Sequence, residues 1–164
     1  MNRVLVVTAS RHGATDEIAR AVGDVLVESG LEVDVRSISD SPDLRSYDAY
    51  VVGSAVYMGK WLPEARAFLA AHRELLSTRP TWLFSSGPIG EQRAGAELDT
   101  GELDRLVEPR DHHVFGGRLQ VGELSGRERF FARLVRARDG DYREWHAVTA
   151  WATAIARSLV PTSV

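Results

Sequence analysis

The chain has 164 residues, of which 44% are hydrophobic and 26% charged, and its net charge at pH 7 is −3. This length suits one domain with a sizeable core, and the mild negative charge argues against nucleic acid as the main partner. The lack of cysteine excludes disulfide scaffolds, thiol catalysis and cysteine-ligated metals. No apolar run is long enough for a signal peptide or a membrane span, which predicts a cytoplasmic protein.

The N-terminal part predicts a strand, a helix and a second strand. Residues 4–7 form an unbroken apolar run, which is typical of strands covered on both faces. A helix is expected from 15 to 29, where apolar residues share one face and Gly30 follows the last turn. Residues 31–38 alternate between apolar and charged side chains, which indicates an edge strand.

Two central strands are expected at 48–54 and 81–86, which are again nearly continuous apolar runs. The helix between them begins at Pro63, and its apolar residues at helical spacing are Phe68, Leu69, Leu75 and Leu76. A fifth strand is expected at 112–117. The last helix should run from 142 to 159 with a buried stripe that comprises Trp145, Val148, Ala152, Ile155 and Leu159.

Strands that alternate with helices predict βαβ crossovers and a parallel sheet in an α/β sandwich of three layers. With an edge-like second strand, the order 2-1-3-4-5 follows, in a single domain that spans 1–164. Ligands bind such sheets beyond the carboxyl ends of the strands, near the point where the strand order reverses. The loops after strands one, three and four are therefore the candidate site.

The loop after the first strand, "TASRHGAT", places several hydroxyls around a turn that leads into a helix. Gly13 permits a backbone conformation that other residues resist, and the helix N-terminus offers backbone N–H groups to a phosphate. The loop has neither the ending of a Walker A motif nor the GxGxxG pattern. The alternative interpretation is that Ser10 or Thr15 simply caps the helix.

Two further loops favour a phosphorylated planar ring. The loop at 53–61 contains two glycines, Tyr57, Met58 and Trp61, and the loop at 85–90 consists of small residues that let a ligand approach the backbone. Flavin mononucleotide (FMN) has the chemistry that these loops suit. Tyr57 and Trp61 could instead be ordinary packing residues.

These loops resemble a known family. The stretch "TASRHGATDEIA" resembles the phosphate loop of flavodoxins, and with "YDAYVVGSAVYMGKWLPEARAFL" it is similar to the menaquinone-dependent protoporphyrinogen dehydrogenases, which are flavodoxin-like proteins. The resemblance covers residues 3–90 well and extends more weakly through "FGGRL" and the last helix. It implies the flavodoxin-like fold and FMN as the cofactor.

The resemblance also implies which residues bind FMN. The phosphate cradle would comprise Thr8, Ser10, Arg11, His12, Gly13, Ala14 and Thr15. One side of the isoalloxazine ring would meet Ser54, Ala55, Val56, Tyr57, Met58 and Gly59, and the other side Ser86, Gly87 and Pro88, with Ile89 and Gly90 close by. Gly59 matches the position whose peptide turns over on reduction in flavodoxins. Met58 stands where many flavodoxins carry a stacking Trp, so Tyr57 or Trp61 is the substitute candidate.

The sequence offers little chemistry besides the cofactor. We identified no Ser–His–Asp array, acid/base pair or metal cluster beside the proposed site, so catalytic residues are unassigned and no metal is expected. His112 and His113 open the fifth strand on opposite faces, which indicates a structural role for both. A receiver domain, which has the same sheet order, is excluded because Thr8 and Ser54 stand where acidic residues are needed.

Two function classes remain, besides a scaffold that has lost its flavin. The first is an FMN-dependent oxidoreductase that oxidises a porphyrinogen-like small molecule and passes the electrons to a quinone. The second is an electron carrier between redox partner proteins without a substrate of its own. Carriers of the flavodoxin type tend to be strongly acidic, and this chain is not.

The segment 118–138 is insertion-like and precedes the last helix. It carries six Arg against two Glu, with an apolar stripe that comprises Phe130, Phe131, Leu134 and Val135. A basic amphipathic helix of this kind could contact an anionic membrane or a substrate that bears propionates. The alternative is that the stripe packs on the domain and the arginines are solvated. The stretch is also shorter than in the dehydrogenases it resembles.

Overall fold

The computed structural model describes residues 2–10, 13–40, 43–57, 59–86, 101–115 and 140–160, with backbone alone for 140–144. Five parallel strands form the sheet, in the spatial order β2-β1-β3-β5-β6. Their bounds are β1 Arg3–Ala9, β2 Glu32–Ser37, β3 Ala49–Tyr57, β5 Thr81–Ser86 and β6 Asp111–Phe115. This confirms the predicted order 2-1-3-4-5 and the flavodoxin-like α/β fold.

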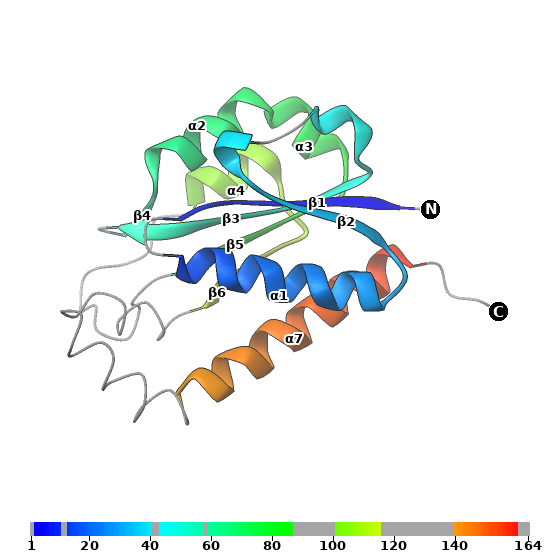
Figure 1. The fold of residues 1–164 in the computed structure, drawn as a ribbon. Coiled ribbons are helices and arrows are strands. Elements are labelled where there is room, and N and C mark those ends of the chain that lie inside the picture. The colour runs from blue at the N-terminus through cyan, green and yellow to red at the C-terminus, as the bar shows by residue number, and fades with distance from the viewer. Residues whose placement is uncertain are drawn as a thin grey trace.

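Helices cover both faces of the sheet (Figure 1). On one face lie α1 (Ala14–Glu28) and α7 (Gly140–Leu159), and on the other α2 (Pro63–Ala71), α3 (Arg73–Thr78) and α4 (Gly101–Val107). Two short 3-10 helices, η1 (Ile38–Asp40) and η2 (Leu44–Ser46), lie between β2 and β3.

The unbroken apolar runs are explained by this layering. In β1, Val4 and Val6 pack with α1 and α7, whereas Leu5 and Val7 pack in the cluster on the opposite face. Since successive side chains of a strand point to opposite faces, a strand buried on both sides needs apolar residues at every position. The edge strand β2 is mostly exposed, as its alternating pattern predicted.

Three features of the fold were not predicted. Strand β3 continues to Tyr57 and turns back into β4 (Lys60–Trp61), which forms a short antiparallel hairpin. Helix α4 was not predicted. The single helix expected after Pro63 is two, because His72 leaves the helical conformation (φ −115°, ψ 19°) between α2 and α3.

The remaining element boundaries agree with the prediction within a few residues. The fifth strand begins one residue earlier than expected, at Asp111, and the last helix two residues earlier, at Gly140. The basic amphipathic segment 118–138 lies outside the described residues.

Gly53 lies inside β3 rather than in a loop. A Cβ atom at this position would overlap the ring of Phe84, which covers the strand from β5. Gly53 pairs with Thr8 on one side and with Phe84 on the other, so its backbone cannot shift without disturbing three strands.

We therefore expect Gly53→Ala to lower the free energy of unfolding by about 1–3 kcal/mol, the usual cost of overpacking a core. Gly101→Ala is the control, because its Cβ would meet only Arg105 Nη1 at 3.5 Å and its effect should be small. Urea unfolding followed by circular dichroism measures both. Equal stability of the two variants would contradict the account of Gly53.

His113 gives the fold a pH dependence of known sign. Its ring packs on Phe115 (centroids 4.3 Å apart) and near Trp151 (5.7 Å). Burial lowers the pKa of His113 below its usual value; Asp111 opposes this shift and His112 adds to it. The unfolded chain therefore binds a proton at this site more readily than the folded chain does.

We expect the free energy of unfolding to fall as the pH drops below the unfolded histidine pKa of about 6.5 and through the lower folded pKa. His113→Phe should flatten this dependence between pH 7 and 5, as measured by urea unfolding at each pH. An unchanged pH dependence in the variant would contradict this assignment.

Candidate functional site at the carboxyl edge of the sheet

The strand registers bring the three predicted loops to one edge. Ala9 at the end of β1 pairs with Ser54 of β3, and Ala55 pairs with Ser86 at the end of β5. The first turn of α1 and the hairpin β3–β4 lie at this same end of the molecule (Figure 1). The site residues predicted from distant parts of the sequence are therefore neighbours in the fold.

The loop after β1 is closed by its own polar groups. Gly13 adopts a left-handed conformation (φ +83°) at the N-cap of α1, and its N–H donates to Ser10 Oγ at 3.0 Å. Thr8 Oγ1 donates to Asp16 Oδ1 at 2.8 Å. No side chain caps α1, so the alternative that Ser10 or Thr15 serves as a simple helix cap is not what the structure shows.

Thr15 has a buried hydroxyl whose partner is not among the described residues. Its side chain has 0% exposure, and its Oγ1 bonds to no atom in the part of the chain that the structure describes. Leaving a buried hydroxyl without a partner costs about 1–3 kcal/mol, so such groups normally bind protein, an ordered water or a ligand. Thr15 lies in the first turn of α1, beside Ala14, where backbone N–H groups also favour an anion.

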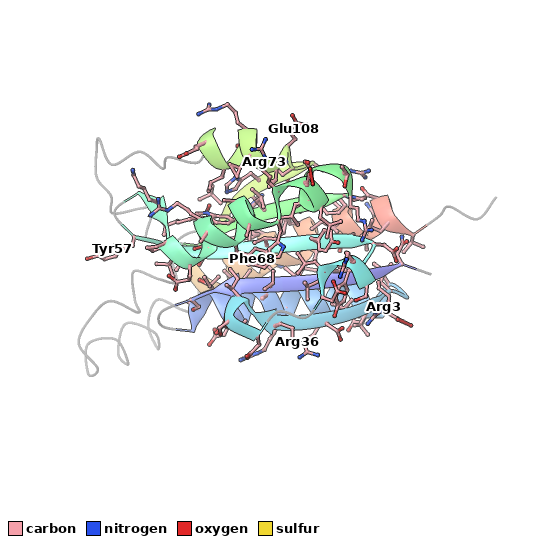
Figure 2. All side chains as sticks on the ribbon, turned by 90° about the horizontal axis from the view of Figure 1, so that it is seen from above. Arg3, Arg36, Tyr57, Phe68, Arg73 and Glu108 are labelled. Carbon is pink, nitrogen blue, oxygen red and sulfur yellow. The ribbon has the colours of Figure 1, made fainter. Side chains whose placement is uncertain are left out.

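The hairpin β3–β4 borders the site on a second side. Val56 pairs with Trp61 and Tyr57 with Lys60, and Gly59 takes a left-handed conformation (φ +79°) in the turn. Tyr57 is 64% exposed and extends from the end of β3, away from the body of the molecule (Figure 2). Trp61 is instead buried, which leaves Tyr57 as the aromatic side chain of this hairpin that a ring could meet.

Ser54 supports the hairpin with its side chain. Its Oγ donates to Ala55 O at 2.7 Å and accepts from Leu62 N at 3.1 Å, and the residue is fully buried. Ala55 and Ser86 are also buried, at adjacent positions of β3 and β5. A ligand at this edge would meet the backbone of these residues.

One prediction was wrong. A Ser–His–Asp array does lie beside the site: Ser85 Oγ and His112 Nε2 are 2.8 Å apart, and His112 Nδ1 and Asp104 Oδ1 are 2.9 Å apart. The sequence pattern did not predict this array because Asp104 belongs to α4, a helix that was not among the predicted elements. His112 and His113 do face opposite sides, since His112 reaches Ser85 whereas His113 packs on Phe115 and Trp151.

Some predicted site residues lie outside the described residues, namely Arg11, His12, Met58, Gly87 and Pro88. Within the described ranges, no group of three or more His, Asp or Glu side chains could hold a metal ion. No helix in the part of the chain that the structure describes is long and apolar enough to cross a membrane.

The chain is similar to known proteins along almost its entire length. The family model described as "Flavodoxin domain" matches residues 5–145. Protoporphyrinogen IX dehydrogenase [quinone] of Escherichia coli K12 is 23% identical over 171 residues, which cover 94% of each chain.

Solved structures share the fold. A flavodoxin from the domain Archaea superposes with a TM-score of 0.62 at 17% identity and covers 95% of this chain and 97% of its own. Rubredoxin oxygen:oxidoreductase of Desulfovibrio gigas gives a TM-score of 0.66 at 15% identity over 97% of this chain, which spans 36% of that longer protein. At these sequence identities, the similarity to solved structures establishes the fold alone.

The sheet order, the loop between β1 and α1, and a family match that covers most of the chain lead to one conclusion: this protein belongs to the flavodoxin family.

Proposed function

We propose that the chain binds FMN at the carboxyl edge of the sheet and is an FMN-dependent oxidoreductase that passes electrons to a quinone. The observation that carries the cofactor assignment is the buried, unpartnered Thr15 Oγ1 behind the left-handed Gly13. A phosphate group would give this hydroxyl its missing acceptor, and it would meet the N–H groups of the first turn of α1. The residues present fit the cofactor of the family.

The chain's own residues would bind and orient the cofactor. Ser10 and Gly13 fix the phosphate loop through their mutual hydrogen bond, and Thr15 donates to the phosphate. The backbone of Ala55 and Val56 would border the ring, and the exposed Tyr57 would stack on it. The predicted contacts of Arg11, His12, Met58, Gly87 and Pro88 remain proposals. When bound, FMN supplies the redox chemistry.

Similarity to the E. coli enzyme supports the proposed substrate class. That relative is a protoporphyrinogen IX dehydrogenase that uses a quinone, and it aligns with 94% of this chain. We propose a porphyrinogen-like reductant and a quinone acceptor. The segment 118–138 is the proposed contact with an anionic membrane surface or with substrate propionates. The alternative is an electron carrier between proteins.

Thr15 and Thr81 provide a matched pair of variants for the cofactor site. Both are buried threonines, but Thr81 Oγ1 donates to Leu76 O at 2.8 Å at the amino end of β5. Thr15→Val should leave the apoprotein as stable or up to about 1 kcal/mol more stable, and it should weaken FMN binding by at least about tenfold. Thr81→Val should do the reverse: it should lose about 1–2 kcal/mol of stability and keep its FMN affinity.

Quenching of FMN fluorescence measures the affinities, and urea unfolding measures the stabilities. Gly13→Val should also abolish quenching, because a β-branched residue resists φ near +83°. Unchanged FMN affinity in Thr15→Val would place the phosphate elsewhere. No quenching by the wild-type chain would refute FMN binding.

The reaction is tested with FMN-loaded protein, protoporphyrinogen and menadione under anaerobic conditions. We expect porphyrin fluorescence to rise faster than without protein. A rate equal to the protein-free rate would reject the dehydrogenase proposal. Reduced protein that then donates electrons to a redox partner protein, without quinone turnover, would favour the carrier.

A further inference from the structure

A network of hydrogen bonds, buried at Trp61 and partly buried from Ser85 to Asp104, connects the hairpin β3–β4 to α4 on one face of the sheet. Trp61 Nε1 donates to Ser85 Oγ at 2.8 Å, Ser85 Oγ lies 2.8 Å from His112 Nε2, and His112 Nδ1 lies 2.9 Å from Asp104 Oδ1. The four residues come from β4, β5, β6 and α4, so the chain ties together elements that are distant in the sequence.

The two ends of this network limit the directions of its bonds. An indole N–H can only donate, and an ionised carboxylate can only accept. Trp61 Nε1 therefore donates to Ser85 Oγ, and Asp104 accepts from the Nδ1–H of His112. In the neutral imidazole, Nε2 then accepts from the Ser85 hydroxyl, so each hydrogen in the network has one acceptor.

The same residue types form nucleophilic triads in hydrolases, but this array cannot act as one. Ser85 has 0% exposure, and its Oγ already accepts the indole N–H of Trp61. A nucleophile must approach the reacting carbon of its substrate, whereas Ser85 Oγ is enclosed between Trp61 and His112. The array therefore has a positioning role.

This hydrogen-bond network holds the hairpin β3–β4 in place. Its antiparallel pairing comprises two residue pairs, Val56 with Trp61 and Tyr57 with Lys60. So short a hairpin is not stable by itself, and its geometry depends on tertiary contacts. The structure provides two buried anchors: Trp61 on Ser85, and the Leu62 N–H on Ser54 Oγ. Arg66 Nε also donates to Trp61 O at 3.2 Å.

We propose that Trp61, Ser85, His112 and Asp104 are positioning residues that fix the hairpin β3–β4 in the conformation that receives the flavin ring. This inference rests on the proposed binding of FMN at this edge. Since Trp61 lies directly beyond the turn that contains Gly59, loss of its anchor would let Tyr57 and the turn move away from the ring.

Trp151 offers a matched control for Trp61. Its Nε1 donates to Asp111 Oδ2 at 2.8 Å, and it is 6% exposed compared with 1% for Trp61, but it belongs to α7 and packs in the core cluster on the other face of the sheet. Trp61→Phe and Trp151→Phe each remove one indole hydrogen bond and a similar volume. Both should lower the apoprotein's stability, whereas FMN affinity should fall by about tenfold in Trp61→Phe and stay within about twofold in Trp151→Phe.

Asp104 tests the chain from its exposed end, where substitutions are least disruptive to folding. Asp104→Leu removes the acceptor for His112 Nδ1, so we expect weaker FMN binding than in the wild type, though by less than in Trp61→Phe. Asp104→Asn keeps an acceptor oxygen and should restore most of the affinity. Equal affinities of Asp104→Leu, Asp104→Asn and the wild type would overturn the role of Asp104.

The apoprotein provides a readout that does not depend on the cofactor. Amide hydrogen exchange at Leu62, measured by nuclear magnetic resonance, should accelerate in Trp61→Phe more than in Trp151→Phe. If exchange is equal in both variants, the anchor does not hold the hairpin and the inference fails.

The two proposals fail in distinguishable ways. If the wild-type chain does not quench FMN, the proposed function fails and this inference fails with it. If the wild type binds FMN and the two tryptophan variants lose equal affinity, the cofactor assignment stands and the positioning role is overturned.

Discussion

The burial of β3 between β1 and β5 is the constraint on which the rest of the structure depends. Its register with both neighbours places Ala9, Ser54 and Ser85 side by side, and the following residues bring three loops to one edge. The close packing of Phe84 over Gly53 holds this register, because a slip by one residue would bring a side chain under the ring. The geometry of the site is therefore a property of the core as much as of the loops.

The buried polar groups of the candidate site differ in whether their hydrogen bonds are satisfied. Around the hairpin, the hydroxyl of Ser54 and the indole of Trp61 are fully partnered. At the start of α1, the hydroxyl of Thr15 has no partner among the described residues. Because a buried hydroxyl without a partner costs stability, the start of α1 is where a ligand would satisfy a group that the described residues leave unpaired. In the proposed complex, the hairpin would support the flavin ring and the start of α1 would receive the phosphate.

The Ser85–His112–Asp104 array illustrates that the same residue types can have a catalytic role in one environment and a structural role in another. The same three groups in an open cleft would form a nucleophile and its base, but here Ser85 is fully buried and accepts the indole N–H of Trp61. Burial turns the array into a support for the hairpin that carries Tyr57 and Gly59. The family's chemistry comes from a cofactor, so the scaffold needs such supports more than it needs catalytic side chains.

The sequence by itself determined the sheet order and the turn that leads from β1 into α1, because apolar runs, the alternating edge strand, and the Gly and hydroxyl pattern of 8–15 are local signals. It did not predict α4, the hairpin β4 or the break at His72, and it therefore missed the bonds that link Asp104, His112, Ser85 and Trp61. Those bonds join residues up to 27 positions apart in the sequence, the separation between Ser85 and His112. The tertiary structure alone decided that Trp61 is buried, that Tyr57 is exposed and that Thr15 Oγ1 has no partner among the described residues. The physical reason is that burial and hydrogen-bond partners are set by which elements pack together, and no local pattern encodes them.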